Sequence, residues 1–305
     1  MKGYILAAIA AATYGTNPAF AVPLYLDGMN PTSVLLFRYG LCLPILAVMI
    51  FYRGRSLRLS RTQILPVAVL GILMALSSLS LFEAYNYMNS GIASTLLFIY
   101  PVLVAILMCF FFHERFRITT GICLVVMGAG LLMLLRTDGT GKQLSGFGCL
   151  MVLVSSLTYA LYLVMTNVSK TVQKIPTLPL LFYQFLFGST VFVFMLAVGR
   201  PLTLPSQPWG WLNLMALAAL PSVVSLGCTT AAIHHIGSTA TAIFGALEPL
   251  TAVVLSVVLL NQSLATHEIV GGLLIMAATT LVVAADPVEN VLLRVRKMFP
   301  PLRRR

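Results

Sequence analysis

The sequence predicts an all-α integral membrane protein with ten transmembrane helices, arranged as two inverted five-helix repeats. Three observations lead to this prediction. The chain of 305 residues is 59% hydrophobic and only 9% charged, whereas a globular protein carries about 25% charged residues to keep its surface wet. The apolar residues fall into ten runs, and two of these runs begin with near-copies of one stretch. The outer surface of the folded chain is therefore expected to face lipid.

The ten apolar runs are the predicted transmembrane helices. Each has about 18–25 residues, enough at about 1.5 Å per residue to cross a hydrocarbon core of about 30 Å. The first run contains Ala19-Phe20-Ala21, which is similar to a signal-peptidase site, but the run continues to Tyr25 and has one preceding Lys, so we expect it to be retained. The predicted spans cover 3–25, 31–52, 63–88, 90–112, 117–135, 145–167, 176–199, 209–233, 238–260 and 266–285.

Two stretches of the chain are copies of each other, 145 positions apart. Pro31–Phe37 and Pro176–Phe182 share five of their seven residues, and each begins the second apolar run of its half. Duplication of an odd number of spans places the second copy upside down in the membrane, an architecture typical of secondary transporters. The predicted units are residues 1–136 with spans one to five, residues 145–285 with spans six to ten, and a basic cytoplasmic tail at 286–305.

Further matches between the halves follow the same order. The offset grows slowly along the chain, which indicates a few inserted loop residues. The matches are Tyr14 with Tyr159 at 145, Ala84 with Ala232 and Ser90 with Ser238 at 148, Pro101 with Pro249 at 148, and Gly121 with Gly271 at 150.

The net charge of +11 raises the question of nucleic-acid binding, and its distribution argues against it. With the amino terminus inside, fifteen of the nineteen basic residues fall on segments on the interior side, three fall on exterior loops, and one, Arg38, lies within a span. This asymmetry follows the positive-inside rule. We expect a multi-pass protein of the inner (plasma) membrane with both termini in the cytoplasm, no nucleic-acid partner, and a tail resting on anionic lipid headgroups.

Three prolines predict interrupted helices at similar depths. Pro18, Pro101 and Pro249 lack an N–H, so they leave the carbonyls of Tyr14, Leu97 and Gly245 without their helical donors. A freed carbonyl is tolerated in a membrane where it faces protein or water. These breaks either line a central cavity, the reading we favour, or serve helix packing alone.

Polar and aromatic residues at matching depths complete the predicted substrate pathway. Tyr14 and Asn17 lie one helical turn apart and share a face, and Tyr159 and Tyr162 repeat the arrangement in the second half. Tyr100 lies far from the ends of its span. Tyr85 joins the set, although an interfacial position explains this residue equally well.

Three charged residues lie five or more residues inside the ends of the predicted spans. Arg38 is seven residues from the outer end of span two, roughly 10 Å deep, and Glu83 is about five residues from the outer end of span three, roughly 8 Å deep. Equal depth and opposite charge predict an ion pair, which is either structural or part of the pathway. Glu248 lies near the midplane without a cation beside it. We expect it to be protonated or bonded to tyrosine hydroxyls, because desolvation disfavours the charged form.

With these features, the chain resembles the EamA family of the drug/metabolite transporter superfamily. The resemblance rests on two tandem five-span units, on Tyr14-Gly15-Thr16-Asn17 in the first span, and on Tyr100-Pro101 and Glu248-Pro249 in spans four and nine. It implies that spans five and ten lie outside the transport core, and it leaves room for a homodimer contact through them. Each of these two spans has one face of small residues, which agrees with close helix contact. These residues are Gly121 and Gly128 in span five, matched by Gly271 and Ala278 in span ten.

The function expected from these observations is secondary transport of a small organic metabolite. The resemblance favours an amino-acid-type exporter working by facilitated diffusion or by exchange with protons, with Glu248 as the first candidate to bind a proton. Uptake of a nucleoside, a nucleotide-sugar or a quaternary amine is the alternative within transport. A membrane enzyme or scaffold is the alternative outside it, although the sequence has no nucleophile–base constellation, phosphate-binding glycine loop or metal-ligand cluster. We expect no cofactor, no metal and no enzymatic activity.

Overall fold

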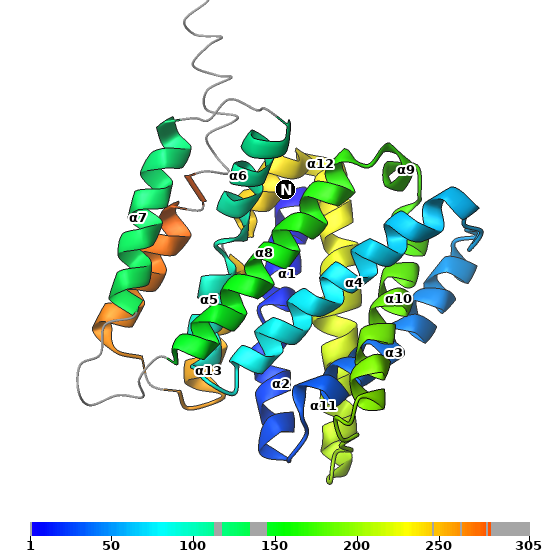
Figure 1. Ribbon diagram of the computed structural model, residues 1–305, viewed down its shortest axis with the longest axis horizontal. Coiled ribbons are helices and arrows are strands. Elements are labelled where there is room, and N and C mark those ends of the chain that lie inside the picture. The colour runs from blue at the N-terminus through cyan, green and yellow to red at the C-terminus, as the bar shows by residue number, and fades with distance from the viewer. Residues whose placement is uncertain are drawn as a thin grey trace, which may run out of the picture.

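The computed structural model describes residues 2–112, 118–134, 145–245, 247–262, 264–278 and 280–281. Within these residues every regular element is helical, as predicted (Figure 1). The predicted basic tail lies outside the described residues. The elements are α1 (Lys2–Tyr14), α2 (Asn17–Leu26), α3 (Pro31–Tyr52), α4 (Arg61–Ala84), α5 (Ser90–Leu97), α6 (Tyr100–Phe112), α7 (Ile118–Leu134), α8 (Gly146–Val168), α9 (Lys170–Gln173), α10 (Thr177–Ala197), α11 (Pro208–Ala218), the π-helix η1 (Ala219–Val224), α12 (Ser225–Phe244), α13 (Leu247–Val258) and a further helix over Thr266–Ala278.

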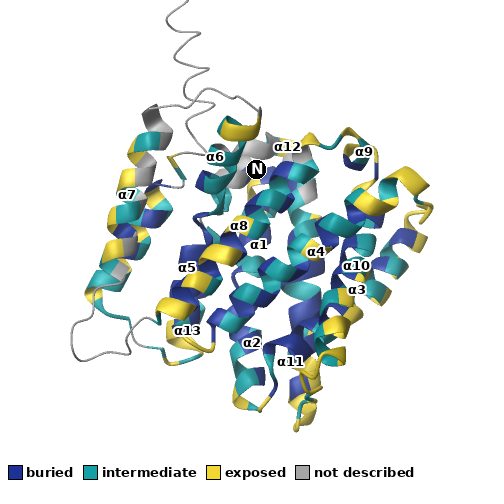
Figure 2. Ribbon diagram, viewed as in Figure 1, coloured by how far each residue is buried: buried dark blue, intermediate teal, exposed yellow. Residues whose placement is uncertain are grey.

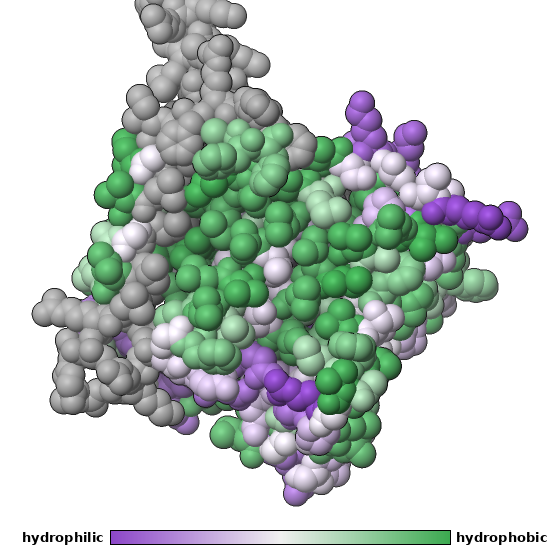
Figure 3. All heavy atoms as spheres, in the orientation of Figure 1, coloured by the Kyte–Doolittle hydropathy of each residue, from purple (hydrophilic) through white to green (hydrophobic). Residues whose placement is uncertain are grey.

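The chain is a membrane protein with several apolar helices. Large apolar side chains such as Phe110 and Leu212 are 78% and 71% exposed, which suits contact with lipid and not with water. Exposed residues line the outer helices in Figure 2, and Figure 3 shows that the middle of this face is hydrophobic. Among the described residues, seven stretches are long and apolar enough to cross a membrane, namely Lys2–Leu26, Pro31–Tyr52, Arg61–Ala84, Ser90–Phe111, Gly146–Thr166, Thr177–Ala197 and Pro208–Thr229.

Helix ends follow capping chemistry that the sequence carries. Pro31 occupies the first position of α3, and the side chain of Asn30 before it accepts a hydrogen bond from Ser33 N at 2.8 Å. Gly54 and Gly199 follow α3 and α10 with φ of 57° and 106°, a left-handed backbone that glycine adopts without strain.

The predicted boundary between spans eight and nine is wrong. The sequence placed a loop after residue 233, but α12 continues from Ser225 to Phe244, and the next described break lies at Gly245, before α13. A polar or glycine residue inside a helix is tolerated, so the residues around His235 do not end the helix. The break comes where Pro249 removes a backbone donor.

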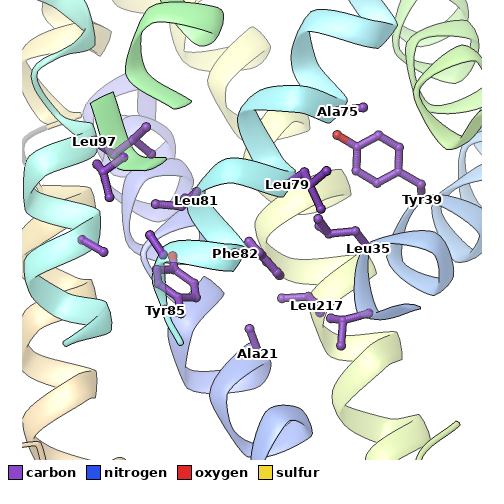
Figure 4. Packing of buried hydrophobic residues seen from close by; sticks show 14 of the residues in the cluster. Ala21, Leu35, Tyr39, Ala75, Leu79, Leu81, Phe82, Tyr85, Leu97 and Leu217 are labelled. Atoms are coloured by element: carbon purple, nitrogen blue, oxygen red, sulfur yellow. The ribbon is translucent and has the colours of Figure 1, made fainter. Parts of the chain in front are cut away.

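Helices from the two halves pack along each other in the core. Helix α1 lies along α12, α4 lies along α8, and α10 lies along both α3 and α4. A Cβ added at Gly71 of α4 would lie 2.7 Å from the backbone oxygen of Gln184 in α10, so glycine permits this close approach. Figure 4 shows Leu35, Phe82 and Leu217 meeting in the core from α3, α4 and α11.

Two interhelical serine bonds are equivalent in the two halves. Ser77 Oγ of α4 donates to the backbone oxygen of Ser155 in α8 at 3.0 Å, and Ser225 Oγ of α12 donates to the backbone oxygen of Ala10 in α1 at 2.9 Å. Ser77 and Ser225 are 148 positions apart, and Ala10 and Ser155 are 145 apart. The same offsets relate the copied stretches of sequence.

Helix α7 packs on the helix Thr266–Ala278. A Cβ added at Gly130 would lie 2.8 Å from the backbone oxygen of Gly271, and the two helices run side by side at the left of Figure 1. The helix face of small residues predicted around Gly271 therefore contacts α7 of the same chain. The residue of α7 at this contact is Gly130, not Gly128.

The two ends of the molecule differ in charge. The basic end holds residues 53–60 between α3 and α4, with three arginines, and the short helix α9 with Lys170. The opposite end holds the turn between α2 and α3 and the residues 198–207, here called the α10–α11 segment. Hydrophilic side chains gather at the upper right of Figure 3, where the α3–α4 connection lies in Figure 1.

Candidate functional site

A small cavity lies where interrupted helices of the two halves meet. Its volume is about 10 Å³, which is the space of about one water molecule. Helices α1, α2, α4 and α5 of the first half and α13 of the second contribute to its wall. Four residues predicted for the pathway lie on this wall. The lining consists of Tyr14, Gly15, Asn17, Leu81, Tyr85, Ser94, Leu97, Glu248 and Ala252.

The break between α1 and α2 places Tyr14 and Asn17 on the cavity. Pro18 leaves the Tyr14 carbonyl without its helical donor, and the side-chain amide of Asn17 supplies one, with Nδ2 at 2.9 Å from that oxygen. Asn17 is 2% exposed, and its Oδ1 is buried without a partner among the described residues. An amide oxygen in this position can accept a hydrogen bond from a ligand.

The breaks at Pro101 and Pro249 are present, and each freed carbonyl has a donor. The hydroxyl of Ser156 in α8 lies 3.3 Å from the Leu97 oxygen. Gly245 accepts from the backbone N–H of Glu248 at 2.9 Å, which forms a tighter turn at the start of α13. Helix α5 ends at Leu97 before α6 begins at Tyr100, and α12 ends at Phe244 before α13 begins at Leu247.

Glu248 reaches the cavity from the first turn of α13. Within the described part of the chain, its carboxylate makes no ion pair or hydrogen bond. The backbone at this point is pressed against the first helix break, since a Cβ added at Gly15 would lie 2.5 Å from the Glu248 carbonyl oxygen. Only glycine at position 15 allows this approach.

Three predicted tyrosines form an aromatic cluster beside the cavity. The rings of Tyr100 and Tyr159 meet edge to face with centroids 4.8 Å apart, and Tyr159 stacks on Tyr162 at 5.7 Å. The hydroxyl of Tyr162 donates to Gln184 Oε1 at 3.2 Å. Tyr100 and Tyr159 both lie near Glu248. The structure thus brings the tyrosines of α6 and α8 close to the wall of the cavity without placing them on it.

Tyr85 is buried, so the interfacial alternative does not apply to it. It is 7% exposed, lies against Phe82 (Figure 4), and shares a hydrogen bond of 3.3 Å with Ser94 of α5.

The predicted ion pair between Arg38 and Glu83 is wrong. Glu83 Oε1 lies 3.1 Å from a terminal nitrogen of Arg200 in the α10–α11 segment, in an ion pair that lacks hydrogen-bond geometry. Equal depth in the membrane did not determine which way each side chain points, and the prediction considered only cations inside spans.

Arg38 lies in the core beside the π-helix. It is 4% exposed, its Nε donates to Ser222 Oγ at 3.0 Å, and its guanidinium carbon lies 5.5 Å from the centre of the Phe82 ring. The aromatic face favours a cation. Pro221 within η1 explains the local π-turn that presents Ser222.

Sequence reasoning missed several residues of the site. Gly15 and Ser94 line the cavity, Ser156 bonds to the carbonyl of Leu97 in its wall, and Ser222 bonds to Arg38. For the serines, the available signal was the depth of a small polar residue in an otherwise apolar run. Among the described residues, no group of three His, Cys, Asp or Glu side chains is placed to hold a metal ion.

The fold and the site define a membrane protein that holds polar side chains at helix breaks inside an apolar bundle. The EamA-like transporter family matches residues 1–136 and 146–284. The chain belongs to the EamA-like transporter family, which confirms the resemblance seen in the sequence.

Individual relatives agree with this assignment. An uncharacterized transporter from Clostridium kluyveri is 22% identical over 303 residues, covering 96% of this chain and 97% of the relative. The uncharacterized inner membrane transporter YhbE of Escherichia coli is 28% identical over 152 residues, covering 48% of this chain and 46% of the relative. A protein of known crystal structure is similar in fold, with a TM-score of 0.65 and 17% identity, covering 92% of this chain and 95% of that one.

Proposed function

We propose that the protein is a secondary transporter that exports a small organic metabolite of the amino-acid type across the inner (plasma) membrane by alternating access. The observation that carries the proposal is the buried cavity at the junction of the helix breaks. Polar groups such as Asn17 and Glu248 cost free energy inside an apolar bundle, and groups of this kind in a membrane mark substrate or proton pathways.

Two inverted repeats around this cavity are part of the proposal. The equivalent serine bonds, Ser77 to Ser155 and Ser225 to Ala10, support it because they join α4 to α8 and α1 to α12 at the offsets of the sequence copies. In such transporters one bundle rocks against the other around a fixed site.

The proposed orientation places the basic end and both termini in the cytoplasm. Arg53, Arg55 and Arg58 of the α3–α4 connection support this, because cytoplasmic loops carry the excess of basic residues. The opposite end would then face the exterior.

Hydrogen bonds hold the opposite end closed in this conformation. Asn30 Nδ2 donates to the Pro201 carbonyl at 2.7 Å, its backbone N–H donates to Thr203 Oγ1 at 2.9 Å, and Ser206 donates to Asp27 through both its hydroxyl and its backbone N–H. These contacts join the α10–α11 segment to the turn between α2 and α3. Their opening would be one half of the transport cycle.

Counterflow in proteoliposomes tests the proposed function. We expect the purified protein to exchange at least one amino acid from a labelled panel. The Tyr14→Phe variant, which removes one hydroxyl from the cavity wall, should slow this exchange, whereas Tyr4→Phe, an exposed tyrosine of the same helix, should not. Absence of counterflow for every member of the panel, with folded protein, would remove the amino-acid assignment.

A further inference from the structure

A second and larger cavity opens at the basic end, away from the site described above. Its volume is about 370 Å³. It lies between the end of α3, the start of α10, and the η1–α12 region. The walls are mainly apolar, and two arginines stand at its rim. The residues used below are Arg53, Arg55, Leu178, Val223 and Ala231, all of which line it.

The sequence offset between the two halves relates residues of this cavity to residues at the opposite end of the molecule. There the corresponding residues form an ion pair. Gly199 follows α10 with a left-handed backbone, and Arg200 directly after it pairs with Glu83 at the end of α4. Gly54 follows α3 in the same way and is directly followed by Arg55, at the offset of 145 that relates α3 to α10. Arg55 is therefore the repeat counterpart of Arg200.

The acid that would pair with Arg55 is absent. The equivalent bonds of Ser77 and Ser225 relate α4 to α12 by an offset of 148 positions. With this offset, the residue of α12 that corresponds to Glu83 is Ala231. Ala231 and Arg55 both line the large cavity. Among the described residues neither Arg53 nor Arg55 forms an ion pair, so the cavity has two guanidinium groups where the opposite end has a completed pair.

We infer that this cavity binds the carboxylate of a small, partly apolar molecule, which occupies the position that Glu83 fills at the opposite end. Arg55 pairs with the carboxylate in the manner common to guanidinium groups. Leu178 and Val223 cover the apolar part of the ligand. The cavity is then the entry site of the transported compound, and in this respect the inference rests on the proposed function. It narrows the substrate to a carboxylic acid with an apolar portion.

Binding of labelled N-acetyl-leucine tests the inference on the full-length protein in phosphatidylcholine nanodiscs. We expect saturable binding that unlabelled N-acetyl-leucine displaces and the uncharged N-acetyl-leucinamide does not. Arg55→Gln should raise Kd about fivefold, the scale of one partly solvated charge pair. Arg58→Gln, an exposed arginine of the same connection that does not line the cavity, should leave Kd unchanged.

A gain of the missing acid gives the sharpest test. Ala231→Glu places a carboxylate beside Arg55, as Glu83 lies beside Arg200, and should abolish probe binding in a protein whose helical content and elution volume match the wild type. Ala231→Gln, of the same size without the charge, should retain more binding. Equal binding by the two variants would overturn the inference.

The remaining arms separate this inference from its alternatives. Undiminished probe binding in nanodiscs containing phosphatidylglycerol supports a small-molecule site, whereas loss of binding there would assign the cavity to a lipid headgroup and overturn the inference. Absence of probe binding to wild-type protein that is active in counterflow would overturn the carboxylate site alone. Probe binding without counterflow of any amino acid in the panel would retain the carboxylate site and remove the amino-acid assignment of the proposed function.

Discussion

Single residues at helix breaks create the polar site of this protein. Asn17 caps the Tyr14 carbonyl that Pro18 leaves free, and at the same time it holds an unpartnered oxygen at the cavity. Glu248 lies one residue before Pro249 and enters the cavity from the first turn of α13. In both places a proline removes the backbone donor of a carbonyl one turn earlier, and a polar residue lies next to that proline in the sequence.

The Glu248→Gln variant should abolish the pH dependence of transport. A carboxyl group at a buried site can exchange a proton, and an amide of the same shape cannot. The measurement is the initial rate of counterflow in proteoliposomes over a series of pH values. A variant profile that matches the wild type would exclude Glu248 as the proton-binding group.

Asp27 provides the control for that experiment. Hydrogen bonds from the Ser206 hydroxyl and backbone N–H hold the pKa of Asp27 below its usual value. Because the pKa is lower in the folded state, the contact stabilises the opposite end at all pH values above the usual range and is lost only as the pH falls through that lower pKa. Asp27→Asn should therefore leave the shape of the pH profile near neutrality unchanged, even where it changes the rate.

Gly15→Ala should destabilise the protein by about 1–3 kcal/mol, the usual cost of overpacking. The added Cβ would meet the Glu248 carbonyl at 2.5 Å and Thr251 Cβ at 2.8 Å, and neither group can move without shifting α13. The control is Gly40→Ala, where nothing lies within 4 Å, which should raise stability by up to about 1 kcal/mol through helix propensity. Unfolding in detergent, followed by circular dichroism, measures both; equal effects would contradict the tight contact.

At the scale of the elements, the sequence was sufficient for most helices and for the breaks that prolines cause. Hydropathy and length predicted the seven long stretches, since only a lipid-facing helix carries so many consecutive apolar residues. The boundary before α13 was missed because His235 and its neighbours read as a loop, although a helix tolerates them. The partner of Glu83 was missed because depth along a helix does not define the direction of a side chain, and Arg200 lies on a connection whose path the sequence does not specify.

The serine bonds should contribute similar free energies in the two halves. Ser77→Ala and Ser225→Ala each remove an interhelical hydrogen bond of 2.9–3.0 Å, and we expect each to lower the free energy of unfolding by about 0.6–1.7 kcal/mol. Ser189→Ala is the control, because its hydroxyl bonds only within its own helix, to the Leu186 carbonyl. Chemical unfolding in detergent measures the three variants. A loss confined to one half would contradict the equivalence of the two contacts.

At the scale of the whole molecule, the two ends of the bundle are in different states. The opposite end is joined by the Glu83–Arg200 ion pair and by the bonds of Asn30 to the α10–α11 segment, while the cavity of about 370 Å³ opens at the basic end. In the transport cycle proposed above, repeats that exchange these two arrangements would expose a central site to one side at a time. The asymmetry is what one conformation of such a cycle requires.

Glu83→Gln should shift the population of conformations towards opening of the opposite end. The variant removes one partner of the ion pair with Arg200 and leaves the neighbouring hydrogen bonds in place, so it weakens the closed state without abolishing it. Spin labels at Leu26 and Leu204, two exposed residues of this end that belong to different halves, report the distance across the contact in a background without native cysteines. We expect the wild type to give a narrow short distance and the variant to add a longer one, and Arg200→Gln should do the same because it breaks the same pair. Arg61→Gln at the basic end should not change the distribution. If Glu83→Gln and Arg200→Gln both retain the wild-type distances while the protein still transports, the ion pair is a structural contact, and closure of this end depends on Asn30 and Asp27 instead.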